Sequence, residues 1–141
     1  DTLGIFGMMD VYYASFWGNH DQNFIKSAFR IFRNYDGRGG KFGETHLPVR
    51  NSDVETRSVY ASLDGDKRIH LVVINKRGES RNFDFRIKAK ERYNRIDVWG
   101  FSQKPKIRKM KKPPIIQAGA FSLQAQPFSV MHIVLSKGQE E

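Results

Sequence analysis

Carboxylates are the side chains of this chain with which acid–base chemistry would start. A pair of them held close together can act as a general acid and a general base. The four glutamates that precede the charged tail all fall in expected turns or on solvent-facing strand positions: Glu44, Glu55, Glu79 and Glu91. We therefore assign no residue of the chain to catalysis.

The four histidines show no spacing typical of a metal site. They are His20, His46, His70 and His132, and no pair of them forms a His-x-His or His-x3-His motif, so zinc binding is not predicted. None of the four histidines has an aspartate or glutamate at a position from which we expect it to pair with the ring. His70 and His132 fall inside strand patterns, where we expect hydrogen-bonded sheet positions. Cysteine is absent, which excludes disulfides and thiol catalysis. The sequence thus predicts no cofactor.

The positive charge is concentrated in the second part of the chain. Residues 1–54 carry six basic and six acidic side chains, whereas residues 55–141 carry 18 basic and nine acidic ones and so hold the whole excess of +9. The run Lys104–Lys112 has six cations in nine residues. Together with other cations the run could form one positive surface that binds polyanions or anionic membranes. These cations are Arg77, Arg81, Arg86, Lys88, Lys90, Arg92 and Arg95. The alternative is a solvated connecting loop that ends at Pro113-Pro114.

Residues 1–36 have the pattern of an α/β unit. The run Val11–Trp17 is apolar on both faces, as in a strand at the centre of a parallel sheet. Apolar residues then recur at helical spacing from Phe24 to Phe32. Asn19 or Asp21 can cap this helix, and Gly37 can end it. Because the strand has no parallel neighbour in the chain, we expect the chain to be a piece of a larger protein.

From Val54 onward the apolar residues alternate with period two, as in a sheet with one wet face. Six short strands are expected, centred on Val59–Leu63, Ile69–Ile74, Phe83–Ile87, Ile96–Trp99, Phe121–Ala125 and Val130–Leu135. Phe83, Phe85 and Phe121 are expected in the core. For four other aromatic residues the sequence does not decide between core and surface: Tyr60, Tyr93, Trp99 and Phe101. Some of them should face outward and could form a shallow surface for carbohydrate.

These patterns predict a mainly β fold, an antiparallel β-sandwich preceded by a strand and a helix. The expected boundaries are 1–37 for the strand and helix, 38–54 for a linker and first sandwich strand, 55–136 for the sandwich and 137–141 for a tail. No apolar run approaches the ~20 residues that span a bilayer.

Several short motifs occur in an order that resembles the carboxyl-terminal part of glycoside hydrolase family 44. They include Leu3-Gly-Ile-Phe6, Phe32-Arg-Asn-Tyr-Asp-Gly37, Ser58-Val-Tyr-Ala-Ser62 and His70-Leu-Val-Val-Ile-Asn-Lys76. The resemblance implies a (β/α)8 barrel joined to a β-sandwich. Val11–Trp17 would then be the last barrel strand, and residues 22–35 the helix that follows it.

The family consists of retaining endo-β-1,4-glucanases and xyloglucanases that use two glutamates. Both family glutamates lie upstream of the segment that Asp1 opens, so the resemblance implies an accessory part that is not catalytic alone. Its partners would be the missing barrel portion and, through a secreted parent enzyme, a polysaccharide. The fragment could also self-associate. The alternative is a stand-alone module that binds glycans or polyanions.

Trp17 is the residue that we link to substrate. In the family arrangement it lies at the carboxyl end of the last barrel strand, the rim where barrel active sites assemble. There a flat indole can stack on a pyranose ring. The alternative is that Trp17 covers the barrel core. His20 and Asp21 follow on the same rim, and a helix cap is the preferred role for Asp21.

Overall fold

The computed structural model describes residues 1–18, 22–51 and 53–138. Two helices come first along the chain, α1 (Thr2–Met8) and α2 (Asn23–Arg33). The strands that follow are β1 (Thr45–Leu47), β2 (Arg57–Leu63), β3 (Ile69–Asn75), β4 (Arg81–Arg86), β5 (Arg95–Phe101), β6 (Arg108–Lys109), β7 (Ala120–Ala125) and β8 (Ser129–Ser136). Each of the six strands expected from the sequence is formed.

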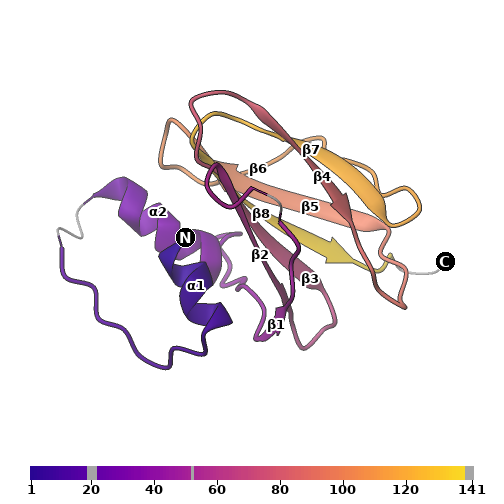
Figure 1. The fold of residues 1–141 in the computed structure, drawn as a ribbon, viewed down its shortest axis with the longest axis horizontal. Helices are drawn as coiled ribbons and strands as arrows, with labels where there is room; N and C mark the ends of the chain where they lie inside the picture. The colour runs from indigo at the N-terminus through magenta and orange to yellow at the C-terminus, as the bar shows by residue number, and fades with distance from the viewer. Residues whose placement is uncertain (19–21, 52, 139–141) are drawn as a thin grey trace.

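The strands form two antiparallel sheets (Figure 1). The larger sheet has the order β1-β2-β3-β8-β5-β6, and the smaller one consists of β4 and β7. In the larger sheet β8 pairs with β3 on one side and β5 on the other, so that Val72 and Trp99 both lie opposite His132. The predicted β-sandwich is confirmed.

Period-two alternation gives the larger sheet two different faces. One face packs against β4 and β7, and its Val73, Ile133 and Leu135 are completely buried. The smaller sheet contributes aromatic rings, of which Phe85 stacks on Phe121 with ring centroids 4.7 Å apart. The core positions expected for the strand phenylalanines are therefore confirmed.

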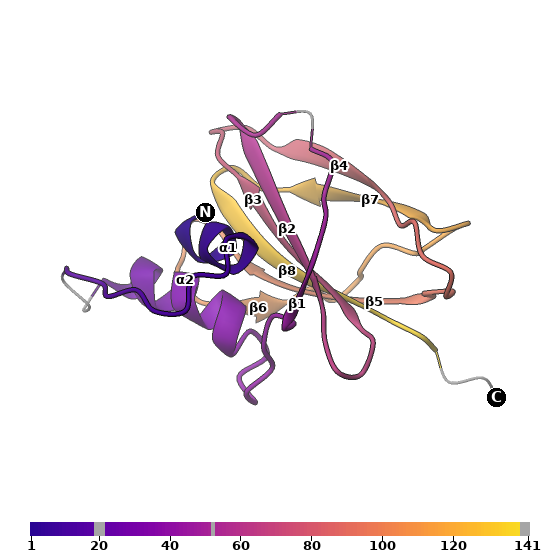
Figure 2. The same cartoon turned by 60° about the horizontal axis from the view of Figure 1, so that its bottom comes forward.

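The opposite face of the larger sheet carries the two helices (Figure 2). α2 buries Ile31 and Phe32 against Val72 and Val134 of this face. α1 comes so close to β2 that a Cβ atom added at Gly4 would lie 2.4 Å from the Tyr60 ring. Glycine is needed there because it lets the helix backbone lie directly on the ring.

Residues 11–17 do not form the expected strand within this chain. They pair with no other strand, and Tyr12 and Trp17 are fully exposed. A parallel strand needs a neighbour to satisfy its backbone groups, and none is present here. The segment's role as a barrel strand stays a prediction.

The helix pattern that follows gives α2, with Gln22 at the N-cap and no side-chain capping bond. Asn19, His20 and Asp21 lie outside the described residues. The helix ends at Asn34, and Gly37 adopts the expected left-handed conformation (φ +76°) in the turn beyond it.

The basic run is more ordered than the connecting loop that we expected. Its centre forms β6, an edge strand paired with β5. Ile107 packs in the core under α2, while Met110 packs in the core between the sheets. Two apolar residues among the six cations are therefore enough to hold the run against the domain.

Candidate functional site

The surface between the two helices is an apolar cavity of about 600 Å³. α1, residues 11–16 and α2 form its walls, and we call it the helix groove. It is lined mainly by Leu3, Phe6, Val11, Phe16, Ile25 and Phe29. Phe16 and Phe29 meet edge to face at 6.0 Å, yet they remain 52% and 40% exposed. The groove therefore presents large apolar side chains that this chain alone does not cover.

α1 is held beside the groove by polar contacts of Asp1. The Tyr60 hydroxyl donates to Asp1 Oδ1 at 2.9 Å, and Lys76 Nζ lies 2.9 Å from Asp1 Oδ2. The carboxylate thus ties the start of α1 to β2 and to the residue after β3. Trp17 lies at the other end of this region, with its side chain 100% exposed. It covers no core within this chain, and its contact with substrate stays a prediction.

α2 is fastened to the sheet by a chain of buried histidines. His132 Nδ1 lies 2.6 Å from the Ile31 carbonyl oxygen, and its Nε2 lies 2.9 Å from His70 Nδ1. His70 Nε2 in turn lies 3.0 Å from Asp64 Oδ2. Both histidines are completely buried. The expected hydrogen-bonded sheet positions of His70 and His132 are confirmed.

The expectation that no histidine has an acidic partner is wrong for His70. Asp64 stands in the turn between β2 and β3, and the hairpin brings it back beside the first residues of β3. An aspartate six residues before a strand histidine, across a tight Asp-Gly-Asp turn, is the signal that reveals the pair. Asp64 also accepts from the Arg68 amide at 2.8 Å and from Arg68 Nε at 2.7 Å.

Burial lowers the pKa of both imidazole rings. It lowers the pKa of His132 to about 3, although the hydrogen bond to the Ile31 carbonyl acts the other way. It also lowers the pKa of His70 and outweighs the nearby Asp64 carboxylate, which raises it. Burial raises the pKa of Asp64, but hydrogen bonds from His70 and Arg68 prevail and hold it below its ordinary value.

The histidine chain satisfies the end of a helix. The last carbonyls of a helix have no partner within it and must find one elsewhere. In α2 the Phe32 carbonyl accepts from the Phe42 amide at 2.7 Å, and the Ile31 carbonyl accepts from His132. Two elements distant in sequence thus fix the end of α2, and with it one wall of the helix groove.

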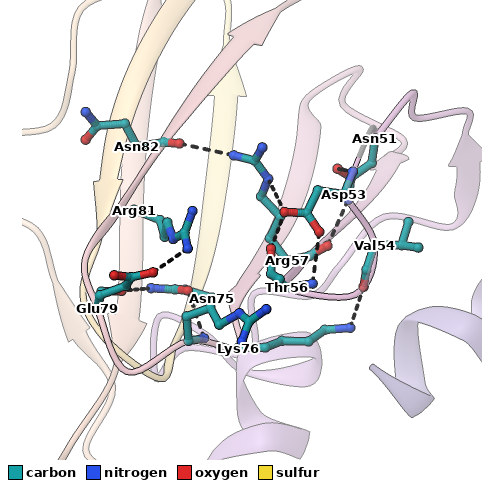
Figure 3. Close-up of polar contacts among 11 residues, drawn as sticks. Asn51, Asp53, Val54, Thr56, Arg57, Asn75, Lys76, Glu79, Arg81 and Asn82 are labelled. Atoms are coloured by element: carbon teal, nitrogen blue, oxygen red, sulfur yellow. Dashed lines mark hydrogen bonds and ion pairs between the residues drawn. The ribbon is translucent and has the colours of Figure 1, made fainter.

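A second polar cluster connects the loops at one end of the sandwich (Figure 3). Asn75 is buried there, and its amide nitrogen donates to the Glu79 and Gln126 carbonyls, each at 2.8 Å. Its Oδ1 accepts from the Arg77 amide at 3.1 Å. All three bonds of the Asn75 side chain are made to backbone groups, so this residue shapes the turns around it.

Two of the glutamates are engaged by cations. Glu79 is bonded to Arg81, and Glu91 to Lys137, as expected for solvated side chains. Among the described residues no group of three or more His, Asp or Glu side chains could hold a metal ion. In the same part of the chain no helix is long and apolar enough to span a bilayer.

The aromatic residues that we expected partly at the surface are packed instead. Tyr60 and Tyr93 are buried. Trp99 and Phe101 belong to the core under α2, where the Tyr35 ring lies 4.7 Å from that of Trp99. Helix α2 therefore covers part of the sheet face on which Trp99 and Phe101 lie.

The cations that could join the basic run in one surface come from different parts of the fold. Arg77 and Arg81 lie where β3 ends and β4 begins, whereas Lys88, Lys90 and Arg92 follow the other end of β4. Lys109 of the basic run is engaged by Asp97 at 2.7 Å and lies 5.0 Å above the Trp99 ring.

Comparisons with known proteins find relatives that are much longer than this chain. No family model matches it. It is 35% identical to the β-mannanase/endoglucanase A of Caldicellulosiruptor saccharolyticus over 92% of this chain and 10% of that protein. It is 34% identical to endoglucanase A of Paenibacillus lautus over 100% of this chain and 21% of that protein.

Solved structures likewise match nearly the whole of this chain and a small part of each relative. A family 44 xyloglucanase from Paenibacillus polymyxa, solved with xyloglucan, matches with a TM-score of 0.92 and 35% identity, over 98% of this chain and 28% of that one. A family 44 endoglucanase from Clostridium thermocellum matches with a TM-score of 0.92 and 35% identity, over 96% and 28%. The resemblance to one part of glycoside hydrolase family 44 is therefore confirmed, and it agrees with the carboxyl-terminal portion expected from the motifs.

Proposed function

We propose that this chain is the carboxyl-terminal accessory part of a family 44 glycoside hydrolase that acts on β-1,4-glucans or xyloglucan. The observation that carries the proposal is the unequal coverage. Relatives named as endoglucanases and xyloglucanases match nearly the whole chain, while the chain spans between 10% and 28% of their length.

In this proposal the helix groove is the surface that meets the catalytic barrel. Its exposed Phe16 and Phe29, together with the unpaired residues 11–17, are apolar and lie next to each other. Burying such side chains typically contributes about 1.5–3 kcal/mol each. The sandwich and the histidine chain would then brace α2 from behind and hold the groove in the shape that the barrel requires.

The isolated chain is not catalytic in this proposal. Retaining hydrolysis needs two carboxylates flanking the scissile bond. Glu79 and Glu91 are ion-paired with Arg81 and Lys137. Among the described residues the one acid that lines the groove is Asp1, which is bonded to Tyr60 and Lys76. Robust hydrolysis of xyloglucan or carboxymethylcellulose by purified residues 1–141 would contradict this part of the proposal.

A chimaera tests the accessory role directly. Residues 1–141 would replace the matching segment of the Paenibacillus polymyxa xyloglucanase, and release of reducing ends from xyloglucan would be measured. We expect activity to be retained. Because Phe29 is exposed here but would be buried against the barrel, Phe29→Glu should abolish activity of the chimaera and leave the melting temperature of the isolated chain unchanged. Arg30→Gln, also exposed on α2 and also lowering the net charge by one, is the charge-matched control. Full activity of the Phe29→Glu chimaera would exclude the groove as the contact.

A further inference from the structure

The histidine chain has an acceptor at each end, and this fixes the number of protons that it needs. The Ile31 carbonyl can only accept, and the Asp64 carboxylate accepts when it is ionised. Between them lie three contacts, at 2.6, 2.9 and 3.0 Å. Each hydrogen bond holds one proton, but two neutral imidazoles supply only two N–H groups. The three contacts can all be hydrogen bonds only when the chain holds a third proton.

The position of the missing proton follows from the carbonyl. His132 must donate Nδ1–H to Ile31, so its neutral ring leaves a lone pair on Nε2. His70 must then donate Nδ1–H to that lone pair. A neutral His70 therefore points a lone pair of Nε2 at Asp64 Oδ2, which repels it. The contact becomes favourable when Nε2 binds a proton and the ring becomes an imidazolium beside the carboxylate.

A buried hydroxyl lies opposite His70 on the neighbouring strand. Ser62 lies directly opposite His70 in the β2–β3 register, and its buried hydroxyl has no hydrogen-bond partner among the described residues. A buried unpaired hydroxyl is costly, on the order of 1–3 kcal/mol. Unlike the carboxylate, a hydroxyl can donate to a lone pair. It can therefore satisfy Nε2 of the neutral ring without any additional proton.

We propose that His70 Nε2 alternates between two partners, the Asp64 carboxylate when the ring is protonated and the Ser62 hydroxyl when it is neutral. The joint between α2 and the sheet would then respond to mild acid. The surrounding charged and titratable groups are Asp64 and Arg68 from the β2–β3 turn, His132 from β8, and Tyr35 and Asp36 beyond α2. This inference concerns the chain itself and does not depend on the proposed function.

The test is a titration of the full chain by imidazole ¹⁵N NMR from about pH 8 to pH 4, the range over which histidines change charge. We expect His132 to remain a neutral Nδ1–H ring throughout. His70 should have an unprotonated Nε2 at high pH and gain a proton there below pH 6.5, the ordinary histidine value. A His70 Nε2 that is already protonated at pH 8, or a His132 ring without Nδ1–H, would overturn the proposal.

Two variants should move the His70 midpoint in opposite directions. Ser62→Ala removes the partner of the neutral ring and should raise the midpoint by about half a unit to one unit, the size of one net hydrogen bond. Asp64→Asn removes the partner of the charged ring and should lower the midpoint. An unchanged midpoint in Ser62→Ala excludes the alternation. If Asp64→Asn does not fold, the carboxyl ¹³C shift of Asp64 in the unaltered chain replaces it, and this shift must change in step with His70.

Discussion

Mild acid should destabilise this chain, and His132 should account for a measurable part of the loss. Its pKa is about 3 in the folded chain, against 6.5 for an ordinary histidine. A group whose pKa is lowered by folding contributes stability that is fully present above the unfolded pKa. That contribution is lost as the pH falls from 6.5 toward 3, because the unfolded chain then binds a proton that the folded chain does not.

The magnitude follows from the pKa difference. Each unit of pKa corresponds to 1.36 kcal/mol, so His132 alone should reduce the free energy of unfolding by about 2 kcal/mol between pH 7 and pH 5. The lowered pKa of His70 acts in the same direction. Asp36, Asp53 and Asp64 have pKa values below that of an ordinary carboxyl and remain ionised over this range. Burial also lowers the pKa of the Asp1 α-amino group, which acts in the same direction as the histidines.

Urea unfolding at pH 7 and pH 5 would measure the effect, with His132→Asn as the matched variant. The asparagine amide can still donate to the Ile31 carbonyl but does not titrate. We expect the variant to be less stable at pH 7 by about 2–3 kcal/mol, because it loses the His70 contact and leaves a small cavity. Its own loss between pH 7 and pH 5 should be about 2 kcal/mol smaller than that of the unaltered chain. Equal losses in the two proteins would refute the reasoning.

Three further outcomes can be checked by chemical denaturation. Gly4→Ala should destabilise the folded chain by about 1–3 kcal/mol, because the new methyl group meets the Tyr60 ring. Its control is Gly7→Ala in the same helix, where the new methyl group has open space and should stabilise the folded chain by about 0.5–1 kcal/mol. Asn75→Ala should cost about 2–4 kcal/mol, because it removes three buried hydrogen bonds, and a loss below 1 kcal/mol would contradict that account. Trp17→Ala should change stability by less than about 0.5 kcal/mol, because its side chain is fully exposed; a larger loss would mean that the indole packs on the chain.

The sandwich could be predicted because its long strands carry local signals: alternation in β2, β4 and β7, and an apolar run in β3 and β8. β6 escaped prediction because it consists of two cations, which are too few to show an alternation, and only the pairing with Trp99 and Gly100 defines it. The segment at 11–17 was expected as a strand because its apolar run suits one, but pairing is a property of the neighbours and not of the run itself. The burial of Tyr60, Tyr93, Trp99 and Phe101 could not be predicted for a similar reason, because it depends on the elements that pack against them.

The site was less predictable than the fold. The partners of His70 and His132 come from a turn, a strand and a helix that lie up to 101 residues apart in sequence. Only the Asp64–His70 contact is local enough to be inferred, from the hairpin between them. The helix groove could not be predicted from any one segment, because α1, α2 and the residues between them line it together.

The order of strands in the larger sheet has a consequence for how the chain folds. β3 and β5 do not pair with each other, and β8 alone joins the β1-β2-β3 group to the β5-β6 group. During synthesis the hairpin of β2 and β3 can form early, but the sheet cannot close until residues 129–136 have been made. Contacts between such distant segments are slow to form because of their loop-closure entropy. Deleting β8 should therefore leave two separate half-sheets, with α2 lacking the surface that orders it.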